Sequence, residues 1–425
     1  MKTQALKGMR DLLPNEQTLR DYIQGKILET YRASGFERIS TPMLEDMENL
    51  DKSDGGDNLN LIFKVLKRGD KLTAALNSGD PKELSDMGLR YDLTLPLSRF
   101  YAANKDKLPH PFKVIQTDRV FRAERPQKGR MRQFHQINCE CLGPSEPYAD
   151  AELVTMAMRF LEALGLKDLS LQLNSLGCPT CRPAYRETLR KWLSELDESA
   201  LCEDCRRRMV TNPLRVLDCK VPSCREHTAE APKILDHNCP DCAAHFETVR
   251  RLLDAEKVPY VINHRLVRGL DYYTRTTFEI VSDQIGAQGT VAGGGRYDGL
   301  VEQLGGPNVS GLGFACGMER LALLLPQPEA GADRPDFFTV VLTDVARDAA
   351  YALTQALRDA GFRGEMGFSS RSIKSAMRQA GKSGARFCLL IGEDELAAQT
   401  VMLKNMDSGE QSSVAFADVV ARLQK

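Results

Sequence analysis

Eight of the twelve cysteines in this chain lie in four close pairs between Cys178 and Cys242. The pairs read CPTC, CEDC, CKVPSC and CPDC. In a reducing cytosol, paired thiols are metal ligands more readily than disulfides, because a two-residue gap lets both sulfurs reach one tetrahedral ion. The pattern favours a small segment stabilised by structural Zn²⁺, with free thiols or redox-active pairs as the alternatives.

Length and composition bound the class of protein. At about 100–200 residues per domain, a chain of 425 residues is expected to hold two to four domains. Its apolar and charged contents, 42% and 27%, are ordinary for a soluble globular protein. No apolar run approaches the ~18 residues of a membrane span, and the first residues lack the apolar core of a signal peptide. We therefore expect a cytoplasmic protein without a membrane partner.

Hydrophobic periodicity divides the chain into zones. Residues 1–166 alternate helix-like and strand-like patterns, among them a helix within 15–36 and a strand over 36–46 that its proline stops. Residues 167–259 are charged, helical and rich in cysteine, which predicts an inserted domain. Strand-like segments resume over 260–326 and return the chain to the first zone.

A linker rich in proline, alanine, glycine and aspartate precedes the last zone. Residues 336–425 then alternate strand and helix patterns at lengths typical of a small α/β domain with a largely parallel sheet. The chain contains no internal repeat and no low-complexity tract. A second, separately folding domain is therefore expected at this end.

Positive charge is concentrated in one predicted hairpin, although the chain carries 57 basic against 58 acidic residues. Five arginines and one lysine fall between Arg119 and Arg132. Strand periodicity puts Gln136, Asn138 and Glu140 on one face of the second strand. Three polar groups on one face either meet solvent or line a polar pocket, so a solvated hairpin with surface ion pairs and an anion-binding site both remain open.

Three further segments carry candidate binding groups. Arg268 lies at a glycine-marked bend before the aromatic pair Tyr272 and Tyr273, which could bracket a flat polar ring. The triplet 293–295 is all glycine and permits close backbone approach, although most such triplets are turns or bulges. Arg320 stands in the first turn of a predicted helix, where backbone N–H groups favour an anion or simply a helix cap.

Taken together, these segments resemble the histidyl-tRNA synthetase family of class II aminoacyl-tRNA synthetases, over essentially the whole chain. Three segments resemble the motifs of the class: GFERISTPMLED, FRAERPQKGRMRQFHQINCECLG and GLGFACGMERLAL. Two more resemble signatures of the histidine enzyme: LVRGLDYYTRT and AGGGRYDGL. The resemblance implies an α+β fold in a homodimer: an antiparallel sheet flanked by helices, a helical insertion and a C-terminal α/β anticodon-binding domain.

The activity implied is a ligase reaction. Histidine and ATP give histidyl-adenylate and pyrophosphate, and the histidyl group then passes to the 3′ end of histidine tRNA. Mg²⁺ is expected with ATP, although no ligand carboxylate can be assigned. No Walker-type or G-x-G-x-x-G loop is found, in agreement with a class II site. The excess of arginine in the hairpin is then explained by ATP phosphates and the tRNA backbone.

By the same resemblance, arginines hold the nucleotide. Arg122 is expected on the α-phosphate and Arg320 on the γ-phosphate side of the bent ATP. Arg268 should bind the α-phosphate opposite the attacking carboxylate. Fixed guanidinium groups aimed at the phosphoryl oxygens would lower the barrier to displacement without proton transfer. Arg130 is expected to join the phosphate and carboxylate contacts, and Glu124 belongs to the predicted ATP-binding set.

Polar groups are expected to read histidine. Two family positions that face the imidazole match Glu140 and Tyr273, with Tyr272 in the same predicted pocket. Gln136 matches the position near the substrate carboxylate. The remaining two predicted residues, Asp92 and Thr94, align with positions that bind the α-amino group. Many family members carry glutamate where Asp92 stands, so the carboxylate is drawn back by about one methylene here.

The other zones also gain expected roles. The C-terminal zone resembles an anticodon-binding domain, and its basic residues form a candidate tRNA-facing patch or merely a solvated helix face. These residues are Arg363, Arg371, Lys374, Arg378, Lys382 and Arg386. The insertion is expected to embrace the acceptor arm of the tRNA. Since many relatives lack the paired cysteines, zinc cannot be inferred from the resemblance.

Three other functions compete with this one. The regulatory paralogue of ATP phosphoribosyltransferase shares the fold, but typically lacks the anticodon domain and the catalytic signatures that this chain retains. A zinc-ribbon protein that binds nucleic acid would use the cysteines alone. A synthetase for another amino acid would share the class motifs, and an ATP–pyrophosphate exchange assay across amino acids separates it from the histidine enzyme.

Overall fold

The computed structural model describes residues 3–52, 59–127, 129–267, 272–284, 289–326, 334–368 and 372–424. The chain divides into two compact units, Met1–Gln327 and Pro328–Lys425, which are considered separately. Among the described helices, none combines the length and apolarity that crossing a membrane requires.

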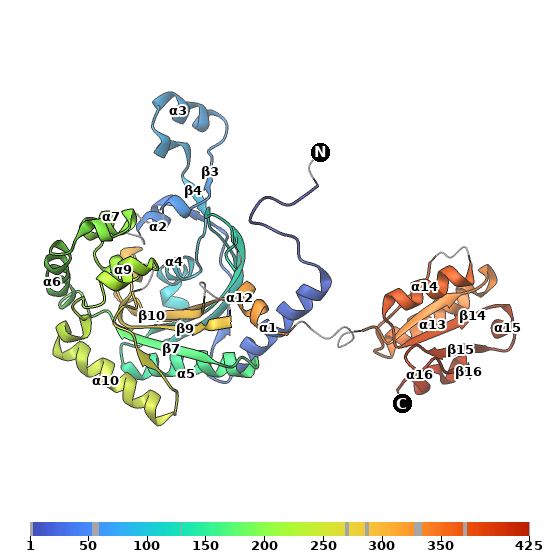
Figure 1. The fold of residues 1–425 in the computed structure, drawn as a ribbon. Helices are drawn as coiled ribbons and strands as arrows, with labels where there is room; N and C mark the ends of the chain where they lie inside the picture. The colour runs from blue at the N-terminus through green and yellow to red at the C-terminus, as the bar shows by residue number, and fades with distance from the viewer. Residues whose placement is uncertain are drawn as a thin grey trace. The chain divides into compact units, whose positions relative to one another are not determined.

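A large twisted sheet is the frame of the first unit (Figure 1). Within the described residues it has eight strands in the order β1-β5-β6-β11-β10-β9-β7-β8. The inner pairings from β5 to β7 are all antiparallel, and only the outermost pairs, β1 with β5 and β7 with β8, are parallel. The strand bounds are β1 Glu37–Arg38, β5 Phe112–Phe121, β6 Gln133–Gly143, β7 Leu169–Ser175, β8 Val261–Ile262, β9 Thr274–Ser282, β10 Thr290–Arg296 and β11 Ser310–Gly317. This confirms the expected antiparallel sheet.

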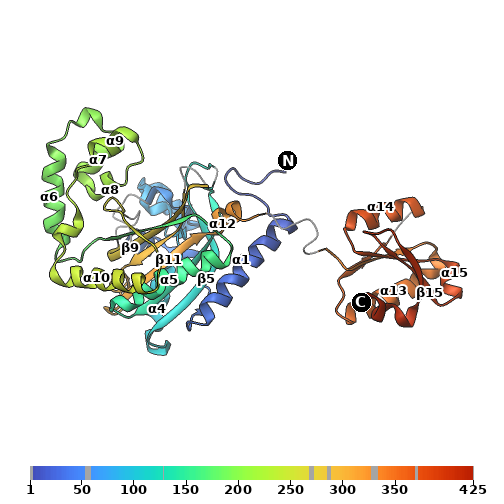
Figure 2. The same cartoon turned by 60° about the horizontal axis from the view of Figure 1, so that its bottom comes forward.

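Helices cover one face of this sheet, as Figures 1 and 2 show for α1, α5 and α10. In α1, Leu19, Ile23, Ile27 and Tyr31 recur every four residues and are all buried, which gives the helix one apolar face. The helices have bounds α1 Pro14–Arg32, α5 Pro147–Ala163, α10 Pro240–Ala255 and α12 Met318–Leu324. Their apolar faces and the sheet form the main core, so the opposite face of the sheet is left for polar groups.

The predicted basic hairpin is confirmed. Strands β5 and β6 pair antiparallel from Phe112↔Leu142 to Phe121↔Gln133. Ile137, Cys139 and Cys141 are buried in the main core, as strand alternation predicts. The polar residues between them therefore point to the other face of the sheet, and most of this hairpin is buried between other elements, which excludes the solvated alternative.

The strand expected in 36–46 does end before Pro42 and lies at a sheet edge, but it is short, Glu37–Arg38. The chain forms β1 at the edge of the large sheet, passes Pro42, and then forms β2 (Leu44–Asp46) in a separate three-stranded sheet, β2-β4-β3. Proline lacks the N–H that a continuous ladder needs. The buried Arg90 guanidinium instead stabilises this bend, because its Nη1 donates to Thr41 O (2.7 Å) and to Pro42 O (3.1 Å).

The small sheet and its neighbours complete the N-terminal part of the unit. Their bounds are β3 Lys64–Val65, β4 Met87–Leu89, α2 Met47–Lys52, α3 Asp70–Ser78 and α4 Thr94–Asn104. In Figure 1, α3 lies at the tip of a projection that leaves the body of the unit next to β3 and β4.

A helical segment connects β7 to β8. Its bounds are α6 Arg182–Ser194, α7 Glu203–Thr211, α8 Leu214–Leu217 and α9 Pro222–His227, followed by α10. Figure 1 shows α6, α7 and α9 together at one side of the sheet. Their buried side chains share a second apolar cluster with Val267, Tyr272 and Tyr273.

The second unit is an α/β domain, as predicted, but its sheet is not largely parallel. The order is β13-β12-β14-β15-β16, in which β12 is parallel to β13 and β14, whereas β14–β15 and β15–β16 are antiparallel. The connections to β15 and β16 are too short for the crossover that parallel pairing requires. Bounds are β12 Phe337–Val341, α13 Arg347–Asp359, β13 Gly364–Met366, α14 Ile373–Ser383, β14 Phe387–Ile391, α15 Glu393–Ala397, β15 Thr400–Asn405, β16 Gln411–Ala415 and α16 Val419–Leu423.

Candidate active site

A cavity on the polar face of the sheet brings together three of the predicted arginines. Arg122 follows β5, Arg130 lies in the β5–β6 loop, and Arg320 is in α12. Glu124 and Gln136 line the same cavity. Residues from segments almost two hundred positions apart therefore converge, as the predicted nucleotide site requires.

The positive charges in this cavity repel one another. Arg320 Nη1 donates to Thr290 O (2.6 Å) and its Nε donates to Gly129 O (3.3 Å), which fixes the guanidinium. Burial, together with the charges of Arg122 and Arg130, lowers the pKa of Arg320. A bound polyanion stabilises such an arrangement, because it offsets the repulsion between cations that are held close together.

Arg122 is held at the inner end of the cavity. Its Nε donates to Tyr91 O (3.0 Å) and its guanidinium lies 5.1 Å from the centre of the Phe134 ring. Glu124 contacts Arg130 in an ion pair and lies 4.0 Å from Arg122. The carboxylate therefore orients two arginines in the present structure.

A second, smaller cavity adjoins the first and contains the residues predicted to read the amino acid. It is lined by Asp92, Thr94, Arg122, Gln136, Glu140, Tyr272, Tyr273, Tyr297, Gly313, Phe314 and Ala315. Arg122, Gln136 and Ala315 line both cavities. A ligand in the small cavity can thus present one end to a ligand in the larger cavity, beside a fixed positive charge.

Glu140 is buried in the floor of the small cavity. Thr94 Oγ1 (2.7 Å) and Asn138 Nδ2 (2.9 Å) donate to its Oε1, and the Tyr297 hydroxyl donates to its Oε2 (2.8 Å). Burial raises the pKa of Glu140 to about 7, and these three donors act in the opposite direction. The carboxyl group is therefore oriented by three neutral donors, while its burial favours the protonated form.

Asp92 presents an unsatisfied oxygen to the same cavity. Its Oδ1 accepts the Leu95 N–H (3.2 Å), while within the described residues the buried Oδ2 has no hydrogen-bond partner. Burial raises the pKa of Asp92 to about 6, and the Leu95 N–H, the charges of Arg122 and Arg90 and the nearby Tyr272 hydroxyl act in the opposite direction. A buried carboxylate oxygen without a donor is a ready partner for a ligand ammonium group.

One expectation changes in this cavity, while the assignment of Thr94 to the α-amino group stays a prediction. The rings of Tyr272 and Tyr273 lie 4.8 Å apart and tilted by 38°, so they contact each other and cannot bracket a third ring between them. Thr94 was aligned with the α-amino group, but its hydroxyl donates to Glu140 and accepts from Asn138 Nδ2 (3.1 Å). Its observed contacts orient Glu140.

Two polar members of the site were not predicted. Tyr297 directly follows Arg296 within the signature AGGGRYDGL, but nothing in the spacing indicated a contact with Glu140. Asn138 shares a strand face with Gln136 and Glu140, and periodicity alone could have assigned it to the site. The predicted Arg268 falls within 268–271, which lies outside the described residues.

The glycine triplet makes close contact with neighbouring strands. A β-carbon at Gly294 would lie 2.0 Å from Gly313 O, and one at Gly295, where φ is +152°, would lie 2.4 Å from Thr276 O. The predicted close backbone approach is thus between β10 and its partners β9 and β11. Gly293 of the triplet also lines the arginine cavity.

Candidate metal ligands lie apart from these cavities. Among the described residues, two groups of four cysteines each bring their sulfur atoms within 4.8 Å of one another. One group is Cys178, Cys181, Cys239 and Cys242, and the other is Cys202, Cys205, Cys219 and Cys224.

Comparison with known proteins gives matches over the whole chain. The family described as Histidyl-tRNA synthetase matches residues 8–321, and the one described as Anticodon binding domain matches residues 336–425. Histidine-tRNA ligase of Nitratidesulfovibrio vulgaris (strain DP4) is 53% identical over 423 residues, 99% of this chain and 98% of that protein. Histidine-tRNA ligase of Syntrophotalea carbinolica is 41% identical over 418 residues, 98% and 97% of the two chains.

Solved structures agree in fold. Apo histidyl-tRNA synthetase of S. aureus superimposes with a TM-score of 0.79 at 30% identity, with 100% of both chains covered. A Bacillus halodurans protein, described as an ATP phosphoribosyltransferase regulatory subunit/histidyl-tRNA synthetase, has a TM-score of 0.65 at 19% identity and covers 89% of this chain and 97% of its own. At 19% identity, the match to the Bacillus halodurans protein shows a shared fold only.

The antiparallel sheet, the arginine cavity and the anticodon-binding unit define a class II aminoacyl-tRNA synthetase. Within that class the full-length matches select one member. The chain belongs to the histidyl-tRNA synthetase family. The regulatory paralogue is not favoured, because relatives that match over the whole chain, both units included, are histidine-tRNA ligases.

Proposed function

We propose that this chain is a histidine-tRNA ligase. It joins histidine to ATP, giving histidyl-adenylate and pyrophosphate, and then transfers the histidyl group to the 3′ end of histidine tRNA. One observation carries this assignment: Arg122 borders both the arginine cavity and the small cavity that contains Glu140 and Asp92. ATP in the first cavity and histidine in the second would meet beside that guanidinium.

The arginines would act on the phosphoryl transfer. A carboxylate oxygen of histidine attacks the α-phosphorus, the bond to the β-phosphate oxygen breaks, and pyrophosphate leaves. Charge develops on the non-bridging oxygens, where Arg122 and Arg268 are assigned. Arg320 takes the γ-phosphate side and Arg130 joins the phosphate and carboxylate contacts, with Glu124 orienting Arg130 as its ion pair suggests.

The small cavity would bind both ends of histidine through polar contacts. Glu140 accepts an imidazole N–H, helped by Tyr273, with Tyr272 packed against Tyr273. Asp92 Oδ2, which lacks an internal donor among the described residues, takes the α-amino group. Gln136 borders both cavities and is assigned to the substrate carboxylate.

The proposal extends to the cofactors and the compartment. Class II synthetases use ATP with Mg²⁺, and the proposal includes structural zinc at the paired cysteines between Cys178 and Cys242. Charging tRNA for protein synthesis assigns the enzyme to the cytoplasm.

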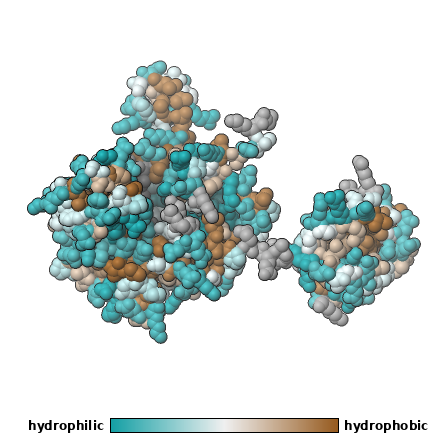
Figure 3. Space-filling model, viewed as in Figure 1, coloured by the Kyte–Doolittle hydropathy of each residue, from teal (hydrophilic) through white to brown (hydrophobic). Residues whose placement is uncertain are grey.

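We also propose a homodimer. Five large apolar residues of the small sheet and its projection are 40–62% exposed: Met43, Leu44, Leu66, Leu76 and Met87. Figure 3 shows the hydrophobic surface on the projection that carries α3. Met43 and Leu44 lie in GFERISTPMLED, the segment that resembles the first motif of the class, which the resemblance places at the dimer interface. Exposed apolar surface of this kind is typical of a subunit interface. Light scattering after gel filtration would give a dimer mass.

For tRNA binding we propose a catalytic core, 1–166 and 260–326, an insertion, 167–259, for the acceptor arm, and 336–425 for the anticodon. Within the insertion, β7 and α10 pack with the main sheet and core, so the acceptor arm is assigned to the helices between them. In 336–425, α14 supports the proposal. Its Lys374, Arg378 and Lys382 are exposed and recur every four residues, which forms one basic stripe. The exposed Arg363 and Arg386 belong to the same predicted patch, and Arg371 lies outside the described residues.

Amino-acid-dependent ATP–pyrophosphate exchange tests the assignment. We expect exchange with histidine and none above background with the other nineteen amino acids. Exchange with a different amino acid would assign another synthetase, and the absence of exchange in a well-folded protein would favour a binding protein.

A further inference from the structure

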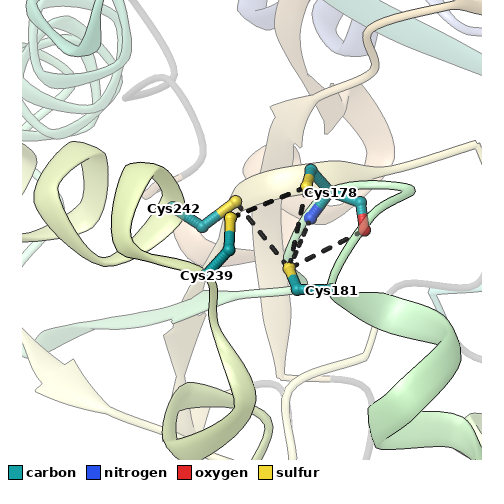
Figure 4. A group of neighbouring side chains, drawn as sticks. All are labelled: Cys178, Cys181, Cys239 and Cys242. Carbon is teal, nitrogen blue, oxygen red and sulfur yellow. Dashed lines mark hydrogen bonds between the residues drawn. The ribbon is translucent and has the colours of Figure 1, made fainter.

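The four cysteine pairs are nested along the chain. The first pair, Cys178 and Cys181, meets the fourth, Cys239 and Cys242, and the two inner pairs meet each other. Spacing alone left this pairing open. Figure 4 shows the outer group, in which the loop before α6 faces the first turn of α10. All eight of these cysteines are free thiols.

The sulfur positions fit a tetrahedral ion. With Zn–S bonds of about 2.3 Å, the edges of a regular tetrahedron are about 3.8 Å long. In the outer cluster the sulfur–sulfur distances are 3.7 Å (Cys178–Cys181), 3.9 Å (Cys178–Cys239) and 3.9 Å (Cys181–Cys242). Cys202 and Cys219 of the inner cluster are 3.9 Å apart. Disulfide sulfurs would be about 2.05 Å apart.

The backbone around the clusters suits thiolates. Cys178 N–H donates to Cys181 Sγ (3.2 Å), and Cys202 N–H donates to Cys224 Sγ (3.1 Å). Gly177 has φ +66°, and a β-carbon there would lie 2.7 Å from Cys181 Sγ. Backbone N–H donors and a side-chain-free approach are features of a site for anionic sulfur. The other four cysteines are buried in hydrophobic cores, three in the main core and one in the second unit.

We propose that the insertion binds two structural zinc ions, one in each Cys₄ cluster. We further propose that the clusters hold residues 265–267 and 272–275, of which Tyr272 and Tyr273 line the small cavity assigned to histidine, the histidine pocket. Each Zn²⁺ would displace the thiol protons of its four ligands. Tetrahedral S₄ sets select zinc or iron among the common metals.

The outer cluster is joined to residues 272–275 through Arg182, the residue after Cys181. Its guanidinium donates to Leu176 O (3.2 Å) and contacts Tyr273 O in a short hydrogen bond. Backbone bonds run in parallel, because Leu176 N–H donates to Arg275 O (2.7 Å) and Arg275 N–H donates to Gly177 O (2.8 Å). The position of Tyr273 therefore depends on the loop that the outer metal fixes.

The inner cluster is joined to residues 265–267 through Thr228. Thr228 N–H and Oγ1 both donate to Cys224 O, at 3.0 and 2.7 Å. Arg265 then donates through Nη1 to Thr228 O (2.6 Å) and through Nη2 to Thr228 Oγ1 (2.7 Å). Each cluster is thus linked through hydrogen bonds to one described stretch: the inner cluster to 265–267 and the outer cluster to 272–275. These stretches lie on either side of 268–271.

This arrangement makes Arg182 and Arg265 positioning residues, a statement that rests on the proposed function. Each acts on the histidine pocket through a carbonyl or hydroxyl contact and touches no substrate group. Loss of either link should loosen the histidine pocket, whereas Arg122, Arg130 and Arg320 of the arginine cavity come from other segments.

Metal content is the first test and does not depend on activity. Full-length protein purified without chelators or a metal-binding tag should carry about two zinc ions per chain by mass spectrometry. Cys181→Ser and Cys205→Ser should each carry about one, and Cys388→Ala, a matched change at a buried thiol of the second unit, about two. Less than one zinc in the wild type, or iron in its place, overturns the sites.

Mercurial titration of the wild type covers the case in which a serine variant fails to fold. The reagent displaces metal from thiolates, and a chromogenic chelator then counts the zinc released. We expect that two zinc ions are released as eight thiols react. Reaction of those thiols without zinc release would overturn the proposal.

The coupling is tested with Arg182→Ala and Arg265→Ala, and with the exposed Arg190→Ala as control. The first two should retain two zinc ions and raise KM for histidine about tenfold in exchange. The control should match the wild type. Unchanged KM for histidine in both variants would overturn the coupling. Should wild-type exchange be absent, the proposed function fails while the zinc count still stands.

Discussion

Gly313 on β11 lies directly opposite Glu140 on β6, and a β-carbon at Gly313 would lie 1.4 Å from Glu140 Oε2. The buried carboxylate therefore occupies the space that any other residue would fill. We predict that Gly313→Ala displaces Glu140, lowers the melting temperature and raises KM for histidine at least tenfold, with a cost of about 1–3 kcal/mol for the overpacking. Exchange kinetics and thermal unfolding measure both effects.

The matched control for that variant is Gly25→Ala in α1, where a β-carbon would meet nothing within 4 Å. Alanine is the better helix former by about 1 kcal/mol, so this control should be at least as stable as the wild type and equally active. A Gly313→Ala enzyme with wild-type KM would show that the position of Glu140 does not govern histidine binding.

Glu140 should also make stability depend on pH. Burial raises its pKa in the folded protein from 4.5 to about 7, so the folded state binds the proton more tightly than the unfolded state. That stabilisation is complete below about pH 4.5 and is lost as the pH rises through about 7. At pH 8, Glu140→Gln should therefore unfold at a higher temperature than the wild type, with a free energy of unfolding larger by about 2–3 kcal/mol. At pH 5 this advantage should be lost.

Thermal scans from pH 5 to pH 8 check this, with Glu83→Gln as a control at an exposed carboxyl group. The same Glu140→Gln protein should have lost histidine-dependent exchange. A Glu140→Gln variant less stable than the wild type at pH 8 would mean that the surroundings of Glu140 favour its charged form, which is the opposite of the expected effect of burial.

Tyr297→Phe removes the donor to Glu140 Oε2 while keeping the ring. The hydroxyl favours the charged carboxylate, so its loss should raise the pKa of Glu140 further and move the acid limb of kcat/KM for histidine to higher pH. At pH 7 a fall in kcat/KM of about 3- to 10-fold is expected for one hydrogen bond. The exposed Tyr148→Phe is the control, and identical pH profiles for the two variants would refute the contact's role.

The sequence predicted the hairpin and the polar face of β6 because both follow from the two-residue period of a strand. It could not predict the contact between Tyr297 and Glu140. Their strands are not neighbours, since β11 lies between β10 and β6. The tyrosine ring crosses over Gly311, where a β-carbon would lie 2.3 Å from it, and that crossing exists only in the assembled sheet.

Other differences have the same origin in long-range contacts. The segment 36–46, expected as a strand that Pro42 stops, contributes short strands to two sheets, and the Arg90 guanidinium binds the carbonyls of Thr41 and Pro42 between them from a distant segment. The nested pairing of the cysteines also depends on the fold, since equal spacings allow several pairings. The class motifs, by contrast, are local, and they sufficed to predict the arginine cavity.

Asp92→Asn tests the end of the pocket assigned to the amino group. The substitution keeps the shape but removes the charge, and a charge-assisted hydrogen bond is worth about 1.5–3 kcal/mol. Affinity for histidine should fall on the order of 10- to 100-fold. Affinity for imidazolelactate, which has a hydroxyl in place of the amino group, should stay within about threefold of the wild type. Equal losses for both ligands would place the amino group elsewhere.

The convergence of arginines on one nucleotide beside the histidine pocket is tested most directly by histidine-dependent ATP–pyrophosphate exchange. Arg122→Ala removes the guanidinium that borders both cavities, and Arg119→Ala removes an exposed one from the same hairpin. We predict exchange in the wild type, near-wild-type exchange in Arg119→Ala and a loss of about 100-fold or more in Arg122→Ala, which remains folded. Full exchange activity in a folded Arg122→Ala protein would show that this guanidinium does not act on the nucleotide.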